Sequence, residues 1–144
     1  MGARPRIVLA DDELNLRKVL GAILQRDGYE ILEARDGEEA LALVAANPGI
    51  AAVITDLRMP RLDGMGLLRR VVAEHPDVPV VMITAHGSVD SAVEAVKLGA
   101  FDYIEKPFEQ LQIQQVVAKA IRTHELDKRA PRVQQTTSPA GRFG

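Results

Sequence analysis

The sequence predicts an α/β fold in which five parallel strands form one doubly wound sheet with helices on both faces. Short apolar runs rich in β-branched residues alternate five times with longer segments of helical period. Several of these runs are apolar at consecutive positions, as is typical of strands that are covered on both faces. Strands joined by helical crossovers lie parallel, and five of them commonly take the order 2-1-3-4-5. Ligands of such sheets bind outside the carboxyl ends of the strands, at the switch point between strands 1 and 3.

The elements are expected in strict alternation. The five predicted strands are residues 7–10, 30–34, 51–56, 79–84 and 101–105. Between and after them, apolar side chains recur with helical spacing, first at Leu16, Leu20, Ile23 and Leu24, and later at Ile113, Val116, Val117, Ala120 and Ile121. Both stripes predict helices that pack on the sheet.

Local signals mark where several helices begin and end. Asp36 with Glu39 resembles a capping box, and Ser88 is suited to cap a later helix. Residues 47–49, Asn-Pro-Gly, end one helix, and Gly99 stands where a glycine follows a helix C-terminus.

The chain of 144 residues has the size of a single domain. Residues 1–128 are expected to form this domain. Residues 129–144 carry three arginines, two prolines and no acidic residue. This composition predicts a flexible tail or the start of a linker.

Composition excludes several classes of function. A net charge of −2 provides no positive field for nucleic acid, and two tyrosines with three phenylalanines are too few for a base-stacking platform. The absence of cysteine excludes disulfides and thiolate metal sites, and it suits a reducing cytosol. No apolar stretch approaches the length of a membrane span or a signal-peptide core. We therefore expect a cytoplasmic domain that contacts neither nucleic acid nor membrane directly.

Polar side chains follow four of the five predicted strands. Asp11 and Asp12 follow the first strand, Asp56 ends the third, Thr84 ends the fourth and Lys106 follows the fifth. Each has a simpler interpretation when taken alone: the acids as helix caps, the threonine as a strand residue and the lysine as a solvated end. Capping does not explain why four separate strands place such groups on one edge of the sheet.

The charges in this predicted cluster indicate a metal site. Three carboxylates within a few ångströms repel one another, so their ionised forms need a cation. Oxygen ligands without histidine or cysteine select a hard ion such as Mg²⁺. Lys106 is expected on the order of 10 Å from the third strand, a gap that only a long side chain crosses. Asp56 lies at the end of the central strand and is the best-placed nucleophile for phosphoryl transfer.

Four motifs together resemble the receiver domain of bacterial two-component response regulators, which has the flavodoxin-like, or CheY-like, (βα)5 fold. The motifs are residues 11–13 (Asp-Asp-Glu), 56–60 (Asp-Leu-Arg-Met-Pro), 84–85 (Thr-Ala) and 106–108 (Lys-Pro-Phe). The resemblance covers about residues 6–128. Residues 86–108 are most similar to receivers of the nitrogen-regulation (NtrC) class, whose full-length members activate sigma-54 transcription.

The resemblance implies a phosphoacceptor and a Mg²⁺ site. Asp56 would receive the phosphoryl group from a phosphohistidine of a sensor histidine kinase. Asp12 and Asp56 would ligate Mg²⁺ directly, Asp11 would act partly through water, and Arg58 would contribute its backbone carbonyl.

The resemblance also assigns a switch. Lys106 would pair with the phosphoryl group and Thr84 would hydrogen-bond to it, so that Tyr103 can turn into the space that Thr84 leaves. Arg58 and His86 match positions that tune autodephosphorylation. The family has a cis peptide at Lys106-Pro107, which proline makes accessible at about 0.5 to 1 kcal/mol.

The surface formed by the fourth helix, fifth strand and fifth helix would change on phosphorylation, could form a homodimer and would control an output, most simply transcription. The chain is not expected to be an enzyme beyond Mg²⁺-assisted self-phosphorylation and autodephosphorylation. The alternative within the family is a stand-alone phosphorelay regulator, with no effector domain after residue 144.

Three other interpretations share some of these features. Haloacid-dehalogenase-type phosphatases use similar groups, but in that family the acid pair follows the nucleophile and a second aspartate stands two residues after it, where this chain has Arg58. A flavodoxin-like cofactor binder would need a phosphate-cradling loop after the first strand, where this chain has two acids. A degenerate receiver that acts only in docking would not keep Asp56, Thr84 and Lys106 together.

Overall fold

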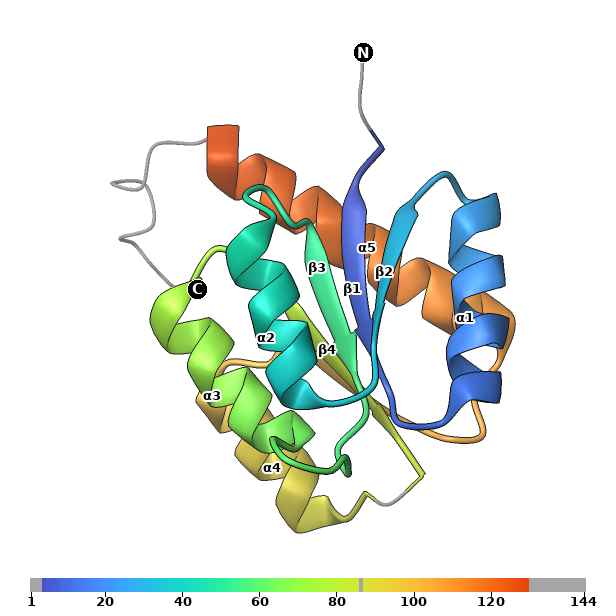
Figure 1. The fold of residues 1–144 in the computed structure, drawn as a ribbon, viewed down its shortest axis with the longest axis vertical. Coiled ribbons are helices and arrows are strands. Elements are labelled where there is room, and N and C mark those ends of the chain that lie inside the picture. Colours follow the sequence, from blue (N-terminus) through green and yellow to red (C-terminus); the bar gives the residue numbers. More distant parts are fainter. Residues whose placement is uncertain (1–3, 86, 130–144) are drawn as a thin grey trace, which may run out of the picture.

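Strands and helices alternate along the chain in a computed structural model that describes residues 4–85 and 87–129. Over these residues the model contains five strands and five helices (Figure 1). In chain order they are β1 (Arg6–Ala10), α1 (Leu14–Arg26), β2 (Glu30–Ala34), α2 (Gly37–Ala46), β3 (Ala52–Thr55), α3 (Gly64–Glu74), β4 (Val80–Thr84), α4 (Val89–Leu98), β5 (Asp102–Glu105) and α5 (Gln110–Arg129).

The strands form one sheet in the order β2-β1-β3-β4-β5, and every neighbouring pair is parallel. Both the fold class and the strand order predicted from the sequence are therefore confirmed. β1 and β3 lie side by side at the centre although a helical crossover, β2 and a second helix separate them in the chain. Their carboxyl ends meet at the switch point, where ligands of this fold bind.

Helices cover both faces of the sheet, as Figure 1 shows. Successive strand side chains point to opposite faces, so β1 contributes to two cores. Its Ile7 and Leu9 pack with residues of α1 and α5, whereas Val8 and Ala10 pack with residues of α2, α3 and α4. Burial on both sides explains why the strand sequences are continuously apolar.

The predicted helix caps are present, with one difference. Asp36 caps α2 and Ser88 caps α4, and Gly99 ends α4 with a φ of 109°, the left-handed conformation that glycine adopts without strain. The Asp36 carboxylate accepts from the Glu39 amide, but the Glu39 side chain accepts from the Arg35 amide instead of that of Asp36. The capping box at α2 is thus formed in one direction only.

The last helix reaches Arg129, one residue beyond the predicted domain boundary at 128. The rest of the predicted tail or linker, residues 130–144, lies outside the described residues. None of the helices over residues 4–85 and 87–129 combines the length and apolar character that a membrane span requires.

Candidate functional site

Backbone pairing continues one residue past the strands and holds the candidate site residues at one edge of the sheet. The amide of Asp11 donates to the last carbonyl of β2 at 3.1 Å, and the amide of Asp56 donates to the last carbonyl of β1 at 2.9 Å. The amide of Lys106 donates to the last carbonyl of β4 at 2.9 Å. These hydrogen bonds therefore fix the backbone of each residue, although each residue lies just beyond the end of its strand.

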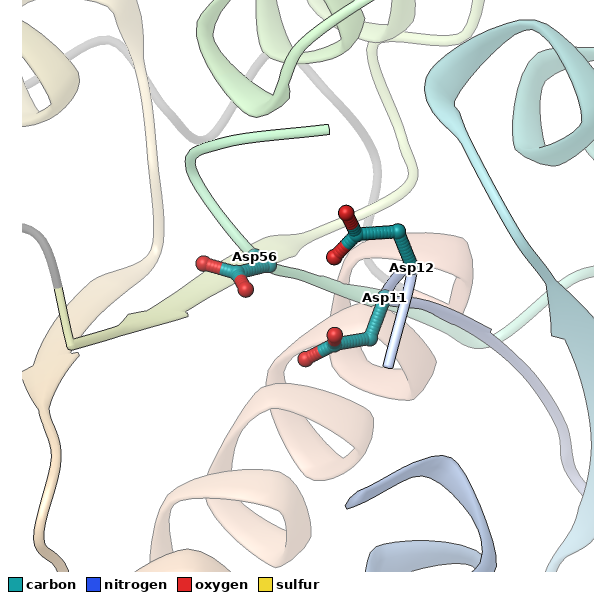
Figure 2. A group of neighbouring side chains, drawn as sticks. All are labelled: Asp11, Asp12 and Asp56. Carbon is teal, nitrogen blue, oxygen red and sulfur yellow. The ribbon is translucent and has the colours of Figure 1, made fainter. Parts of the chain in front are cut away.

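The acids form the predicted cluster. Figure 2 shows the carboxylates of Asp11, Asp12 and Asp56 gathered beside the ends of β1 and β3. One oxygen from each lies within 4.8 Å of the others. Asp11 and Asp56 are only 3% and 6% exposed, whereas Asp12 faces solvent. The cluster is thus buried at Asp11 and Asp56 and open to solvent at Asp12.

Lys106 bridges the gap from β5 to the acids. Its Nζ lies 3.5 Å from Oδ2 of Asp11 and 3.5 Å from Oδ2 of Asp56. The lysine side chain is itself 16% exposed. One ammonium group pairs with two of the three carboxylates, so the site keeps an excess of negative charge when all three are ionised.

The environment of Asp11 disfavours its charged form. Burial is the largest cause and raises the pKa of this carboxyl above its ordinary value, and the nearby Asp56 charge raises it further. The Glu13 amide, which donates to Oδ1 at 2.8 Å, and the Lys106 ammonium act in the opposite direction. A bound cation would relieve both the burial penalty and the repulsion between acids.

The loop after β3 fixes the orientation of Asp56. Its Oδ1 accepts from the amide of Leu57 at 2.6 Å, which leaves Oδ2 directed at Lys106. Gly64 at the start of α3 packs directly on this turn: its amide donates to the Leu57 carbonyl at 2.8 Å, and a Cβ at this position would overlap the Asp56 carbonyl oxygen. Only glycine allows α3 to approach the Asp56 backbone so closely.

The two residues of the predicted switch lie on neighbouring strands. Thr84 is fully buried at the end of β4, and Tyr103 is half-buried on β5. The Tyr103 hydroxyl and the Ser91 hydroxyl of α4 lie 2.7 Å apart in a hydrogen bond. Ser91 also completes a capping box with Ser88, so this bond connects β5 to the N-terminus of α4.

The remaining predicted residues differ in how far the structure describes them. Arg58 is exposed in the loop after β3, and His86 lies outside the described residues. The Lys106-Pro107 peptide is cis, as the resemblance implied. The simpler interpretation of Asp11 and Asp12 as helix caps does not hold, because the N-cap of α1 is Glu13 and no side chain caps that helix.

One residue that contacts the site, Arg17 of α1, was not predicted from the sequence. Its Nη1 donates to the carbonyl of Asp11 at 2.6 Å, and its side chain is buried. A signal was present in the sequence: Arg17 precedes Leu20 by three residues and Leu24 by seven, so it lies on the apolar face of the helix.

The donor set suits a small hard cation. One oxygen from each acid lies within 4.8 Å of the others, so all three acids could contribute ligands to a single ion. Carboxylate oxygens, with one acid open to solvent, match an ion that keeps several waters. The arrangement can hold a divalent metal beside a carboxylate nucleophile and an ammonium group.

Comparison with known proteins gives a family match over most of the chain. The model of the response regulator receiver domain family matches residues 7–118. This range includes the acids, Thr84, Tyr103, Lys106 and Arg17.

Individual relatives point to the same class. The nitrogen assimilation regulatory protein NtrX of Azorhizobium caulinodans is 40% identical over 134 residues, which cover 92% of this chain and 30% of that protein. The crystal structure of the receiver domain of NtrX from Brucella abortus is 38% identical and superposes with a TM-score of 0.76, covering 81% of this chain and 98% of that one. The solution structure of a beryllofluoride-activated NtrC4 receiver domain dimer is 33% identical, with a TM-score of 0.78, covering 83% and 98%. The resemblance to receivers of the nitrogen-regulation class is therefore confirmed. This chain corresponds to less than a third of the Azorhizobium regulator's length.

Proposed function

Because the chain belongs to the response regulator receiver domain family, we propose that Asp56 accepts a phosphoryl group from a phosphohistidine of a sensor histidine kinase. The observation that carries this proposal is the position of Asp56: its carboxylate lies at the sheet edge among two further acids and 3.5 Å from the Lys106 ammonium. The domain is a signalling module, and its chemistry is limited to gaining and losing this phosphoryl group.

The transfer uses the Asp56 carboxylate as nucleophile. One of its oxygens attacks the phosphorus atom, a P–O bond forms and the P–N bond to the donor imidazole breaks. The imidazole leaves with the electron pair of that bond; it is neutral histidine if the other ring nitrogen already carries a proton, and otherwise it takes one proton from solvent. In deactivation, water attacks the phosphorus of the acyl phosphate, the P–O bond to Asp56 breaks, inorganic phosphate leaves with the water oxygen and the carboxylate is restored. In the unphosphorylated domain, the bond from the Leu57 amide to Oδ1 leaves Oδ2 directed at Lys106.

The proposed metal is Mg²⁺, held by Asp11, Asp12 and Asp56 with the backbone carbonyl of Arg58. When bound, the ion neutralises charge on the transferring phosphoryl group. Lys106 would provide a second positive group, which would pair with the phosphoryl oxygens. Arg58 and His86 are proposed to set how fast the acyl phosphate hydrolyses, because both positions match those that tune lifetime in the family.

The proposed switch follows from new hydrogen bonds to the phosphoryl group. Charge-assisted bonds contribute about 1.5 to 3 kcal/mol each, and moving a conformer from 1:99 to 99:1 needs about 5.5 kcal/mol. Bonds from Thr84, Lys106 and a backbone amide would together supply the free energy that this change in population needs. When Thr84 moves toward the phosphate, Tyr103 can turn inward, and it must then give up its bond to Ser91 of α4.

The surface that would change is that of α4, β5 and α5. It carries exposed apolar side chains at helical spacing, Val89, Val93 and Val96 on α4, together with Leu111 on α5. We propose that the phosphorylated domain forms a homodimer here, in line with the activated NtrC4 receiver dimer to which it is similar. Transcription is the proposed output, through an effector domain joined by the linker that begins near residue 129, and the reaction is placed in the cytoplasm.

Intact mass spectrometry after incubation with acetyl phosphate and Mg²⁺ tests the proposal. One phosphoryl increment is expected for the wild type and none for Asp56→Ala or in the presence of EDTA. Asp63→Asn is the matched control, because Asp63 is an aspartate outside the cluster whose capping of α3 the amide preserves. A parallel titration with beryllofluoride detects the site if the acyl phosphate hydrolyses quickly. Equal labelling of wild type and Asp56→Ala would contradict the proposal.

A further inference from the structure

Arg17 places a guanidinium group in the interior of the domain, beside the acidic cluster. The residue is only 8% exposed, although arginine is rarely buried unless its charge is paired. Its Nε donates to Oε1 of Glu33 on β2 at 3.0 Å, and Lys18 donates to the other oxygen of Glu33 at 3.1 Å. This ion pair accounts for the charge of Arg17, but it uses only one side of the guanidinium.

The other side contacts the main chain of the candidate metal site. Nη1 of Arg17 donates to the carbonyl oxygen of Asp11 at 2.6 Å, in a buried hydrogen bond. Asp11 follows the last residue of β1, so the ladder of the sheet no longer supplies a donor for this carbonyl over the described residues. Arg17 therefore donates the hydrogen bond that a neighbouring strand would donate within the sheet.

The Asp11 carbonyl belongs to the peptide group that joins Asp11 to Asp12. Changes in the torsion angles that flank this peptide, ψ of Asp11 and φ of Asp12, would move the two carboxylates relative to each other, because this peptide joins their Cα atoms. The preceding peptide group is held because the Asp11 amide donates a hydrogen bond to β2. The Asp11 side chain is held because it accepts a hydrogen bond from the Glu13 amide. The bond from Arg17 supplies the remaining constraint.

We propose that Arg17 is a positioning residue for the metal site: by holding the Asp11–Asp12 peptide it sets the spacing of the two carboxylates that receive the ion. Arg17 does not touch the metal or the phosphoryl group. The inference rests on the proposed Mg²⁺ site, and Glu33 assists by fixing the guanidinium from β2.

The sign of the effect on metal affinity separates positioning from electrostatics. Arg17 is a cation near a cation site, so electrostatics alone predict that a neutral residue at position 17 strengthens Mg²⁺ binding. Loss of positioning predicts the opposite, because partners that orient metal ligands typically contribute about 10- to 100-fold in affinity. Arg17→Met keeps the length and apolar stem of the side chain and removes both charge and donors.

Mg²⁺ titration of the full chain by calorimetry tests the inference without a phosphoryl donor. We expect Arg17→Met to bind Mg²⁺ about tenfold more weakly than the wild type. Val117→Ala, which shortens a buried side chain of α5, controls for general destabilisation and should bind normally. In the metal-free protein, the carbonyl carbon of Asp11 and the amide nitrogen of Asp12 should shift in the NMR spectrum of Arg17→Met but not in that of Val117→Ala.

The outcomes distinguish this inference from the proposed function. If the wild type binds Mg²⁺ and Arg17→Met binds it equally or more tightly, the positioning role is overturned and the metal site stands. If the wild type binds no Mg²⁺, the proposed site and the positioning role both fail. If Arg17→Met does not fold, Arg17→Lys replaces it: one ammonium cannot reproduce both contacts, so weaker binding is again expected, and unchanged binding overturns the inference.

Discussion

Lys106 is in close contact with the same carboxylates that would receive the metal. In the structure it lies 3.5 Å from Asp11 and 3.5 Å from Asp56, so it competes with a cation for their charge. The same ammonium would become favourable once a phosphoryl group with its own negative charge is attached to Asp56. Lys106 is therefore expected to weaken metal binding before the phosphoryl group is transferred and to bind the phosphoryl group afterwards.

Replacing this ammonium with an apolar group should separate its two roles. In Lys106→Met we expect Mg²⁺ to bind roughly tenfold more tightly, because a positive charge beside the cation site has been removed. Conformational change on beryllofluoride addition, followed by the NMR signals of β5, should be lost. Lys119→Met, at an exposed lysine of α5, is the control and should leave both properties unchanged. Weaker Mg²⁺ binding by Lys106→Met would show that the lysine supports the metal site instead.

At the scale of the element, the N-terminus of α2 illustrates how charge stabilises this fold outside the site. Asp36 is buried at the N-cap, accepts from the Glu39 amide and pairs with Arg61, whose φ of 66° lies in the left-handed region. The Glu39 amide is the largest cause of a lowered pKa for Asp36, with burial opposing it and Arg61 adding to it. The ionised carboxylate is thus favoured in the folded protein.

This lowered pKa makes the contribution of Asp36 dependent on pH. A depressed folded-state pKa stabilises the fold at pH above the unfolded pKa, about 3.9 for aspartate, and the contribution is lost as the pH falls through the folded value. Asp36→Ala should lower the free energy of unfolding at neutral pH by about 1 kcal/mol, as the loss of an N-cap does. Asp36→Asn keeps the cap but loses the charge, so its free energy of unfolding should lie between those of the wild type and Asp36→Ala. Urea denaturation at decreasing pH should show the gap to wild type narrowing below the unfolded pKa, and a constant gap would contradict this account.

Sequence patterns predicted the elements and the main acids because both depend on short-range rules. Continuous apolar runs identify buried parallel strands, and the ends of such strands converge, which brought Asp11, Asp56 and Lys106 together correctly. Arg17 was missed because its partner at the site is a backbone carbonyl in the loop before α1, and every residue type has such a carbonyl. The ion pair of Asp36 with Arg61 was missed for a related reason: it depends on the path of the loop before α3.

At the scale of the whole molecule, the site and the proposed dimer surface are connected through β5. Lys106 follows this strand at the site, and Tyr103 within it bonds to Ser91 of α4, the helix that carries the exposed valines. A change at the acids can therefore reach the surface over a short path. The outer end of that path is the exposed face of α4.

A charged residue on the exposed face of α4 should prevent dimerisation of the domain without preventing its phosphorylation. In light scattering, the wild type with Mg²⁺ and beryllofluoride should show a larger mass than without them. Val96→Lys, at a valine that is 61% exposed on α4, should remain monomeric under both conditions and still gain one phosphoryl increment from acetyl phosphate. Val19→Lys, at a comparably exposed valine on α1, should behave as the wild type. Equal masses for the wild type with and without the mimic would contradict the proposed dimer.

If folding makes Asp56 the phosphoacceptor of a metal-dependent site, the phosphoryl group must be found on that residue, and its position on the chain can be measured. Borohydride reduces an acyl phosphate of aspartate to homoserine, which peptide mass mapping then assigns to a position. After treatment with acetyl phosphate and Mg²⁺, we predict homoserine at position 56 alone, and none when EDTA is present. Homoserine at position 11 or 12, or modification that is independent of the metal, would contradict the account.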